Sequence, residues 1–200
     1  MTNPSTGAAR VRADLLESAR VKTVLAEECG DAIAAAADAV IDAYRAGHKT
    51  ILFGNGGSAT DALHIAAEWT GKLGPDRPAL PSIALPANAA ETTAIGNDYG
   101  YDHIFVRGIE AHGRPGDVAI GISTSGNSPN VLGGLEEARR RGLVTIGLTG
   151  RGGGKLADRV DHALVVPSDD TARIQEGHIA IGHAIATLVD AVLFPETQQG

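Results

Sequence analysis

The sequence predicts a doubly wound α/β fold, in which helices cover both faces of a parallel sheet. Five short apolar runs have the length of strands, and strand, loop and helix recur along the chain. The runs are continuously apolar rather than alternating, as in strands that are buried on both faces. A parallel sheet with helical crossovers is the architecture that satisfies both observations.

Two helices are expected before the first strand. In the first helix, apolar residues recur at helical spacing: Leu15, Leu16, Val21, Val24 and Leu25. The Ala-rich segment 32–46 is expected to form the second helix, which Gly47 ends. The five expected strands are 50–53, 82–85, 118–122, 144–148 and 163–166. Residues 171–193 are then expected to form one long helix, whose composition suits partial burial against a neighbour.

The chain is expected to be one domain, over residues 9–194, with a flavodoxin-like sheet. Its 200 residues, 43% of them apolar, can bury one core, and no segment has the composition of a long linker. Residues 1–8 are expected to be a disordered N-terminus, and residues 195–200 a flexible tail. The helical pair at one end and the long helix at the other indicate an oligomer interface.

Composition argues against two classes of partner. A formal charge of −7 and an aromatic content of 4% do not suit a nucleic-acid surface, which needs a basic face and stacking rings. No window approaches the ~20 apolar residues of a membrane span, and the N-terminus lacks a signal-peptide core. A cytoplasmic protein is therefore expected. Cys29 is the single cysteine, so no intrachain disulfide can form, and its surroundings favour a structural thiol.

The loop 54–58 (GNGGS), the glycine loop, connects the first strand to a helix. Ser58 is expected to be the helix N-cap, with Asp61 completing a capping box. Backbone amides and the positive end of a helix dipole, at the carboxyl end of a strand, are what a phosphate needs. Glycine and serine are equally ordinary in strand-to-helix turns, so this loop alone favours neither a phosphate site nor a plain turn.

The loop 123–128 (STSGNS), the serine loop, is a stronger candidate for a phosphate site. It also follows a strand, and Ser128 is a good N-cap before Pro129, a good first helical residue. Its three consecutive hydroxyl residues, a glycine and another serine exceed what a turn requires. We therefore expect its hydroxyls and the amides of the helix start to hold an anion.

Two nucleotide-binding alternatives fail on the sequence. Gly54, Gly56 and Ala59 match part of the dinucleotide fingerprint, but that fingerprint needs an acidic residue at the end of the next strand. Here that strand runs into Pro86 and Ala87. The sequence also lacks the lysine pattern of nucleoside triphosphate-binding loops.

Four residues on two predicted helices could hold a divalent metal. His64 and Glu68 are four residues apart on the helix after the glycine loop, so both project from one face. Gln175 and His183 are eight residues apart on the last helix, about 80° around its axis and ~12 Å along it. Imidazoles with a carboxylate suit zinc, but glutamine is an uncommon ligand. From spacing alone, a chance arrangement of these residues is favoured over a metal site. The other histidines are expected at surface or cap positions: His48, His103, His112, His162 and His178.

Five motifs, in this order, carry a resemblance to a known family. They are GNGGSATDALHIAAEWTG, AIGNDYGYDHIF, GDVAIGISTSGNSPNVL, LTGRGGGKLA and RIQEGHIAIGH. With them the chain resembles the phosphoheptose isomerases, members of the sugar isomerase (SIS) fold, over about residues 50–194. The helical N-terminal segment also fits that family.

The resemblance implies conversion of sedoheptulose 7-phosphate to D-glycero-D-manno-heptose 7-phosphate, in a homotetramer whose active sites are shared between subunits. It implies one divalent metal per active site, expected to be zinc, with the ligands His64, Glu68, Gln175 and His183. The implied substrate contacts are Asn55, Gly56, Gly57, Ser58, Glu68, Asn97, Asp98, Ser123, Thr124, Ser125, Ser128 and Gln175. Glu68 is the expected base and His183 the expected acid. Because a carboxylate bound tightly to metal is a poor base, one of the two could act only as a ligand.

Two positions depart from the pattern of that family. Lys72 stands where the family often has arginine, and Ala172 stands where it often has aspartate, for which Asp169 or Asp170 could substitute. The competing hypothesis is a non-catalytic scaffold, similar to the replication-initiator-associating protein of the same fold. Such a scaffold should lack the catalytic carboxylate and the imidazole of the last helix, which this chain retains. A sugar-phosphate-sensing regulator would need an attached DNA-binding module, for which 200 residues leave no room.

Overall fold

The computed structural model describes residues 4–195. Its main elements are α1 (Pro4–Arg45), β1 (Thr50–Gly54), α2 (Gly57–Thr70), β2 (Ser82–Ala84), α3 (Ala89–Tyr99), α4 (Ile104–His112), β3 (Val118–Ser123), α5 (Pro129–Arg140), β4 (Val144–Thr149), β5 (His162–Val165) and α6 (Thr171–Leu193). The short 3-10 helices are η1 (Leu85–Ala87), η2 (Tyr101–His103), η3 (Arg151–Gly153) and η4 (Ala157–Arg159). The strands and the last helix lie where the sequence predicts them, apart from shifts of one residue at strand ends.

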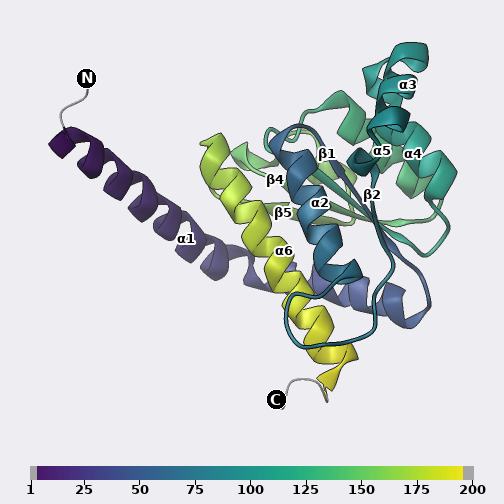
Figure 1. The fold of residues 1–200 in the computed structure, drawn as a ribbon, viewed down its shortest axis with the longest axis horizontal. Coiled ribbons are helices and arrows are strands. Elements are labelled where there is room, and N and C mark those ends of the chain that lie inside the picture. The colour runs from purple at the N-terminus through teal and green to yellow at the C-terminus, as the bar shows by residue number, and fades with distance from the viewer. Residues whose placement is uncertain (1–3, 196–200) are drawn as a thin grey trace.

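The strands form one parallel sheet in the order β2-β1-β3-β4-β5 (Figure 1). This is the flavodoxin-like order, so the predicted doubly wound fold is confirmed. The strand order reverses between β1 and β3, whose carboxyl ends are neighbours, with Gly54 paired to Ile122. In this fold ligands bind outside the carboxyl ends at such a reversal, and both predicted phosphate loops begin there.

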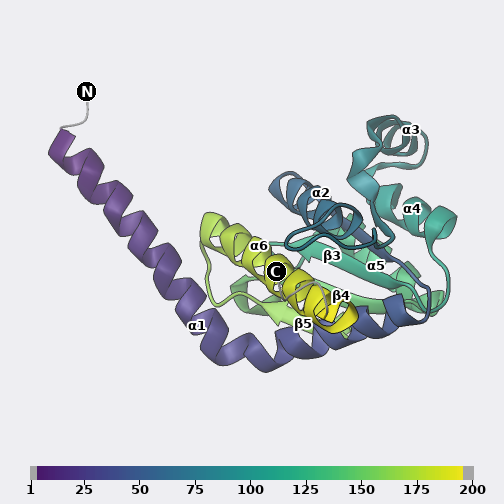
Figure 2. The ribbon, with the colours of Figure 1, turned by 60° about the horizontal axis from the view of Figure 1, so that its bottom comes forward.

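Helices cover both faces of the sheet (Figure 2). One face packs against α1, α2 and α6 through strand residues such as Leu52 and Ile120. The other face packs against α4 and α5 through Ile51 and Phe53, and the Phe53 ring centroid lies 5.0 Å from that of Phe105. Successive strand residues point to opposite faces, which is why each strand needs a continuous apolar run.

The N-terminal region is one helix, not the expected pair. α1 runs unbroken through Gly30, which costs the helix only about 1 kcal/mol relative to alanine. No proline or left-handed residue stops the helix before Gly47, whose φ is 81°. The helix therefore includes residues 4–8, for which loose chain was expected. Residues 1–3 and 196–200 lie outside the described residues.

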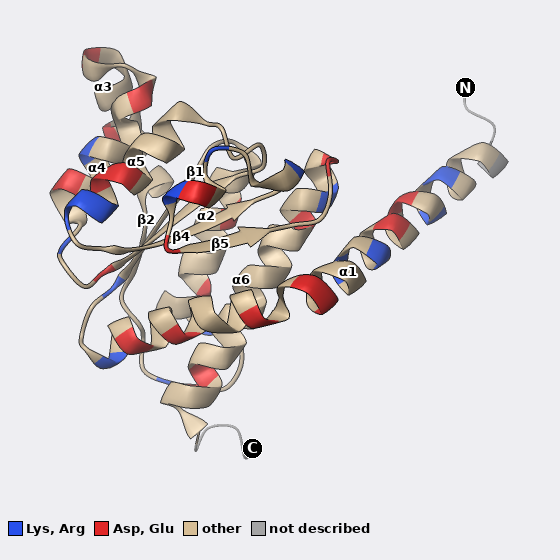
Figure 3. Ribbon diagram, turned by 180° about the vertical axis from the view of Figure 1, so that it is seen from behind, with Lys and Arg blue, Asp and Glu red and all other residues tan. Residues whose placement is uncertain are grey.

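The two halves of α1 have different surroundings. The C-terminal half packs against α6 and β5, where the half-buried Cys29 thiol lies 3.4 Å from the Val165 carbonyl oxygen and burial raises its pKa. This environment suits a structural thiol. The N-terminal half projects away from the sheet, and leaves Val11, Leu15 and Leu16 exposed by 59%, 67% and 64%. Acidic and basic residues are interspersed along this half (Figure 3).

The expectation that no window approaches a membrane span is wrong for α6, which among the described residues is the one helix long and apolar enough to cross a membrane by length and composition. In the structure it is a packed helix of the α/β fold. Of its most apolar window, 44% is buried, and the helix contacts both α1 and α2.

Candidate active site

The glycine loop positions the start of α2. This helix begins at Gly57, and Gly56 occupies the N-cap with a φ of 55°, a left-handed conformation that suits glycine. The expectation that Ser58 is the N-cap is therefore wrong, because Ser58 lies inside the first turn and is buried. A Cβ on Gly57 would lie 2.2 Å from Nε2 of Gln175, so this glycine lets the amide from α6 approach the helix start.

The serine loop is shaped partly by its own hydrogen bonds. Ser128 is the N-cap residue of α5, as predicted, but its hydroxyl pairs with the Ser123 hydroxyl at 2.9 Å instead of capping the helix. The Ser125 hydroxyl accepts a hydrogen bond from the Asn127 backbone N–H at 3.2 Å. Its own O–H can therefore still be donated to a ligand.

Gly126 allows the serine loop to lie against the glycine-rich segment that precedes β5. Its φ is 64°, and a Cβ there would lie 2.1 Å from the carbonyl oxygen of Gly153. The Gly126 carbonyl accepts a hydrogen bond from the Leu156 N–H at 3.0 Å, and Oδ1 of Asn127 accepts one from the Lys155 N–H at 3.2 Å. Two backbone segments thus hold each other in place.

A pair of asparagines joins the glycine loop to α5. Nδ2 of Asn55 donates to Oδ1 of Asn130 at 2.8 Å, and Nδ2 of Asn130 donates back to Oδ1 of Asn55 at 2.9 Å. The Tyr101 hydroxyl also donates to Asn55 at 3.0 Å. Asn55 and Tyr101 line a pocket of about 190 Å³ between the glycine loop, α3 and α4. Sequence reasoning missed Asn130 and Tyr101, because nothing local to them indicates a partner so distant along the chain.

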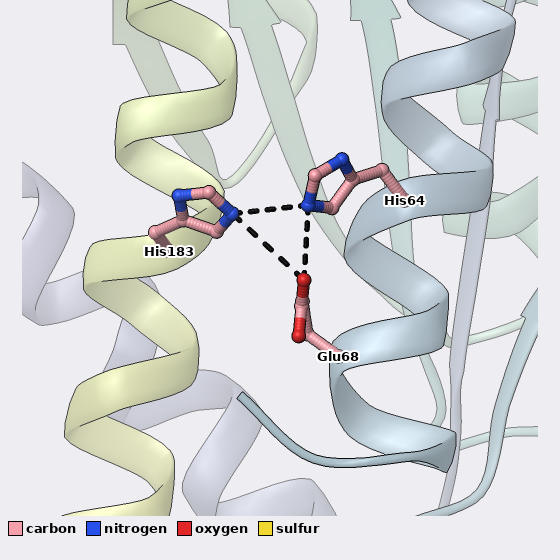
Figure 4. Close-up of side chains that lie close together, drawn as sticks. All are labelled: His64, Glu68 and His183. Atoms are coloured by element: carbon pink, nitrogen blue, oxygen red, sulfur yellow. Dashed lines mark hydrogen bonds and ion pairs between the residues drawn. The ribbon is translucent and has the colours of Figure 1, made fainter. Parts of the chain in front are cut away.

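Three side chains converge from two helices (Figure 4). His64 and Glu68 project from one face of α2, and His183 meets them from α6; we call these residues the trio. Nε2 of His64 lies 2.9 Å from Oε1 of Glu68 and 3.1 Å from Nε2 of His183. The distance from Oε1 of Glu68 to Nε2 of His183 is 3.9 Å. The structure therefore brings together three of the four expected metal ligands.

The trio fits a divalent cation. Its three ligand atoms lie within 4.8 Å of one another, and two imidazoles with one carboxylate form a donor set typical of catalytic zinc. Close packing of the two helices makes the convergence possible, since a Cβ on Gly182 would lie 2.5 Å from Cγ1 of Ile65. Gly182 and Ile65 are the immediate chain neighbours of His183 and His64.

A pocket of about 480 Å³ lies beside the trio and includes His183 among its lining residues. Gln175, the fourth expected ligand, lines the same pocket, as do Lys22 and Asp61. Asp61 was expected only to cap α2, yet its carboxyl is buried with Oδ2 unpaired, and burial raises its pKa to about 6 against the opposing effect of His64. Its position one turn before His64 is the signal that could have identified it as a site residue.

Asn97 and Asp98 are not brought to the other expected site residues. Both are exposed on α3, which buries none of its residues, and Nδ2 of Asn97 donates to Oδ1 of Asp98 at 2.8 Å. Neither residue lines the two pockets described above. Within residues 4–195 of one chain, their assignment to the substrate has no geometric support.

The surface or cap position expected for His178 is wrong. Its side chain is fully buried, because α6 turns this face toward the end of β4. Neither ring nitrogen has a hydrogen bond of good geometry, although the backbone of Thr149 is near enough to favour the charged form. Burial dominates and lowers the pKa of His178 to about 4, so the ring is neutral near pH 7.

The two departures from the family pattern have ordinary structural surroundings. Lys72 is exposed, and its Nζ lies 3.4 Å from Oδ1 of Asp76. Ala172 lies in the first turn of α6, and its N–H donates to the carboxylate of Asp170 at 2.8 Å. Asp170 is thus the N-cap of this helix, and its bonds from the N–H groups of Arg173 and Ala172 lower its pKa. Of the two proposed substitutes, Asp169 is the one that the helix start does not use.

Comparisons with known proteins agree with the fold. A family model described as the SIS domain matches residues 16–150. The structure of phosphoheptose isomerase GmhA from Neisseria gonorrhoeae has a TM-score of 0.87 and 43% sequence identity, covering 92% of this chain and 98% of that one. A phosphoheptose isomerase from Francisella tularensis has a TM-score of 0.89 and 36% identity, covering 95% and 99%. The phosphoheptose isomerase of Geobacter sp. (strain M21) is 52% identical over 184 residues, 92% of this chain and 96% of the relative.

The parallel sheet, the paired loops at its carboxyl edge and the matching family model define a SIS-domain protein. Within that class the chain belongs to the phosphoheptose isomerase family, as its identity to full-length relatives shows. It is therefore an aldose–ketose isomerase, and a sugar phosphate is the class of substrate that it is expected to bind.

Proposed function

We propose that this protein converts D-sedoheptulose 7-phosphate to D-glycero-D-manno-heptose 7-phosphate in heptose biosynthesis. The observation that carries the proposal is the convergence of His64 and Glu68, on the helix that begins at the glycine loop, with His183 on α6. The phosphate would bind to hydroxyls and amides of the serine loop: Ser123, Thr124, Ser125 and Ser128. The sugar would contact Asn55, Gly56, Gly57, Ser58 and Gln175. Asn97 and Asp98 would reach it only in an active site shared between subunits.

The spacing along α2 supports this arrangement. His64 lies seven residues beyond Gly57, the first residue of the helix, and Glu68 lies eleven beyond it. At the helical rise, these positions are ~10 Å and ~16 Å from the helix start. Such a separation leaves room along α2 for the carbon chain of the substrate between the glycine loop, which would contact the sugar, and the trio.

The proposed reaction moves the carbonyl from C2 to C1. Glu68 removes the proton from C1, and the electron pair forms the C1–C2 double bond of an enediolate as charge develops on the C2 oxygen. His183 transfers protons between the two oxygens, and a proton returns to C2, so that the product carries an aldehyde at C1. The 3.9 Å between Oε1 of Glu68 and Nε2 of His183 lets both groups reach one two-carbon unit.

We propose one divalent metal ion per active site, with zinc as the metal. His64, Glu68, Gln175 and His183 would hold it. When bound, the ion supplies Lewis-acid stabilisation of the developing negative charge. If Glu68 is both base and ligand, its bond to the metal has to loosen when substrate binds.

We further propose that the protein is a cytoplasmic homotetramer. The projecting half of α1 supports an oligomer, because Val11, Leu15 and Leu16 together line an exposed groove of about 490 Å³. An isolated helix that exposes apolar side chains has little stability of its own in water. Light scattering of the wild type and of a Leu15→Lys, Leu16→Lys variant tests this: a tetramer that dissociates in the variant is expected, and a monomeric wild type contradicts the proposal.

Incubation of the purified protein with sedoheptulose 7-phosphate tests the function, with the product followed by NMR. We expect D-glycero-D-manno-heptose 7-phosphate to form, and a chelator to abolish its formation until zinc is restored. A protein that leaves the ketose unchanged under all metal conditions would refute the proposal. That result would favour the non-catalytic scaffold.

A further inference from the structure

Arg77 lies in the connection after α2, and its guanidinium is buried at the last turn of that helix. Its side chain is 1% exposed, and its Nε lies 2.7 Å from Oδ1 of Asp190 on α6, whose side chain is 5% exposed. The pair therefore joins α2 to α6 inside the protein. These are the two helices that supply the trio.

The guanidinium is also bonded to the backbone of α2. Its Nη2 donates to the carbonyl oxygen of Glu68 at 2.7 Å, and its Nη1 donates to that of Trp69 at 2.8 Å. Nη1 is also within hydrogen-bond distance of the carbonyl oxygens of Gly71 and Pro78, at 3.2 and 3.0 Å. Carbonyls at a helix C-terminus lack intrahelical partners, and a cation there is favourable. One of the fixed carbonyls belongs to the residue that we propose as the base.

Asp190 lies on the helix that supplies His183, the third residue of the trio. It lies seven residues after His183 on α6, which is two helical turns and the same face. The connection from Glu68 through Arg77 to Asp190 therefore links the backbone of one trio residue to the helix face of another.

A stability role alone does not account for this pair. Moving both charges out of water costs free energy, and a buried ion pair replaced by apolar side chains is often neutral or stabilising. The planar guanidinium fork of arginine instead fixes how α2 and α6 are oriented relative to each other, because its N–H donors point in set directions toward the carboxylate and the carbonyls.

We propose that the Arg77–Asp190 pair is a positioning device that sets the distance between Glu68 and His183. This inference rests on the proposed function, since the trio is its target. Arg77 and Asp190 are positioning residues: their hydrogen bonds described above reach each other and backbone carbonyls, and they act through the α2 backbone and α6. The serine loop follows β3 and makes none of these contacts, so phosphate binding should not depend on the pair.

The test combines Co²⁺ titration of the metal-free protein, read by its visible absorption, with steady-state kinetics. The variants are Arg77→Lys, which keeps the charge but loses the fork, and Asp190→Asn. The double variant Arg77→Met, Asp190→Leu removes both charges and should fold even if a single change leaves an unpaired buried ion. The control is Lys49→Gln, which breaks a partly buried ion pair with Asp117 at the amino edge of the sheet.

We expect the Co²⁺ dissociation constant to rise about 10-fold to 100-fold in the three variants, as when outer partners of metal ligands are removed. The absorption bands should change and kcat should fall, while KM stays near the wild-type value. The control should bind Co²⁺ as the wild type does. Wild-type Co²⁺ affinity and spectrum in the double variant would overturn the positioning role and leave the proposed function intact. A wild-type protein that takes up no Co²⁺ would overturn both.

Discussion

The proposed metal half of the site consists of side chains from two helices, whereas the proposed phosphate half consists of backbone and hydroxyls at the end of a strand. The distances between the trio's nitrogen and oxygen atoms depend on how closely α2 and α6 approach, because these atoms lie at the ends of side chains from the two helices. The serine loop is held by neighbouring backbone, with Gly126 against the carbonyl of Gly153. The two halves should therefore respond differently to mutation.

The difference follows from the chemistry that each half has to perform. A phosphate distant from the reacting carbons needs the same binding in the ground state and in the transition state, and several weak donors provide it. Proton transfer needs one group at one place, so a single side chain decides the rate. Single substitutions in the phosphate half should each weaken substrate binding modestly, whereas one substitution in the metal half should remove most of the activity.

Glu68→Gln should produce the largest effect. The amide keeps the size of the side chain but cannot accept the proton from C1, so kcat should fall by ~10²-fold or more with KM little changed. Steady-state kinetics measures both, and circular dichroism checks the fold. Glu136→Gln, at an exposed position of α5, is the control and should behave as the wild type. Turnover near the wild-type rate in Glu68→Gln would remove Glu68 from the role of base.

Gly126→Ala should have the next largest effect. The added Cβ would lie 2.1 Å from a backbone oxygen of Gly153, so the serine loop or its neighbour has to move. An overpacked site costs about 1–3 kcal/mol, and kcat/KM should fall roughly 10-fold to 100-fold through KM.

Gly152→Ala is the matched control for that change. Gly152 is also left-handed, with a φ of 71°, but a Cβ there meets no atom within 4 Å. It should lose about 1–2 kcal/mol of stability from backbone strain alone and keep its KM. Equal KM values in the two variants would mean that the packing of the serine loop is irrelevant to substrate binding.

Ser125→Ala should raise KM less than Gly126→Ala does. Removal of one hydroxyl that donates to a phosphate costs about 1.5 kcal/mol, so KM should rise roughly 10-fold while kcat changes less. Ser125→Thr keeps the hydroxyl and should restore most of the affinity. An unchanged KM in the alanine variant would count against the serine loop as the phosphate site.

His178→Leu should leave catalysis near pH 7 nearly unchanged and alter the pH dependence of stability. The folded-state pKa of His178 is about 4, below the ordinary value of 6.5, so the unfolded chain binds more protons between these pH values. The free energy of unfolding of the wild type should therefore fall as the pH drops from 6.5 toward 4, by roughly 3 kcal/mol from this group.

Over much of that pH range, Asp61 changes the free energy of unfolding in the opposite direction to His178. Its pKa is raised from 3.8 to about 6, so the stability linked to its protonation is present at low pH and lost as the pH rises through 6. Urea unfolding of the wild type, His178→Leu and Asp61→Asn at several pH values separates the two. A wild type and a His178→Leu variant with parallel stability curves between pH 4 and 6.5 would contradict a buried neutral histidine.

Local sequence patterns predict most of the fold. Continuous apolar runs mark all five strands, and the long apolar pattern of α6 marks its full extent. The pattern fails at α1, because a glycine such as Gly30 weakens a helix without ending it. It also misplaces the N-cap of α2, since a left-handed Gly56 takes the position that a serine normally occupies.

Within the candidate site, sequence spacing finds the partners that share one helix. His64 and Glu68 are one turn apart and can be paired by inspection. The Asn55–Asn130 and Arg77–Asp190 contacts join distant segments, and only the folded chain brings them together. The burial of Asp61 and His178 is likewise set by tertiary packing, and so are their pKa values.

The most direct measurement is a crystal structure of the zinc-loaded protein with sedoheptulose 7-phosphate, with data collected at the zinc absorption edge. The account predicts one anomalous peak between His64, Glu68 and His183, and a phosphate bound by the serine loop. It also predicts a C1–C2 unit between the carboxylate and the imidazole. Zinc at another position, or a substrate phosphate bound away from residues 123–128, would contradict the account.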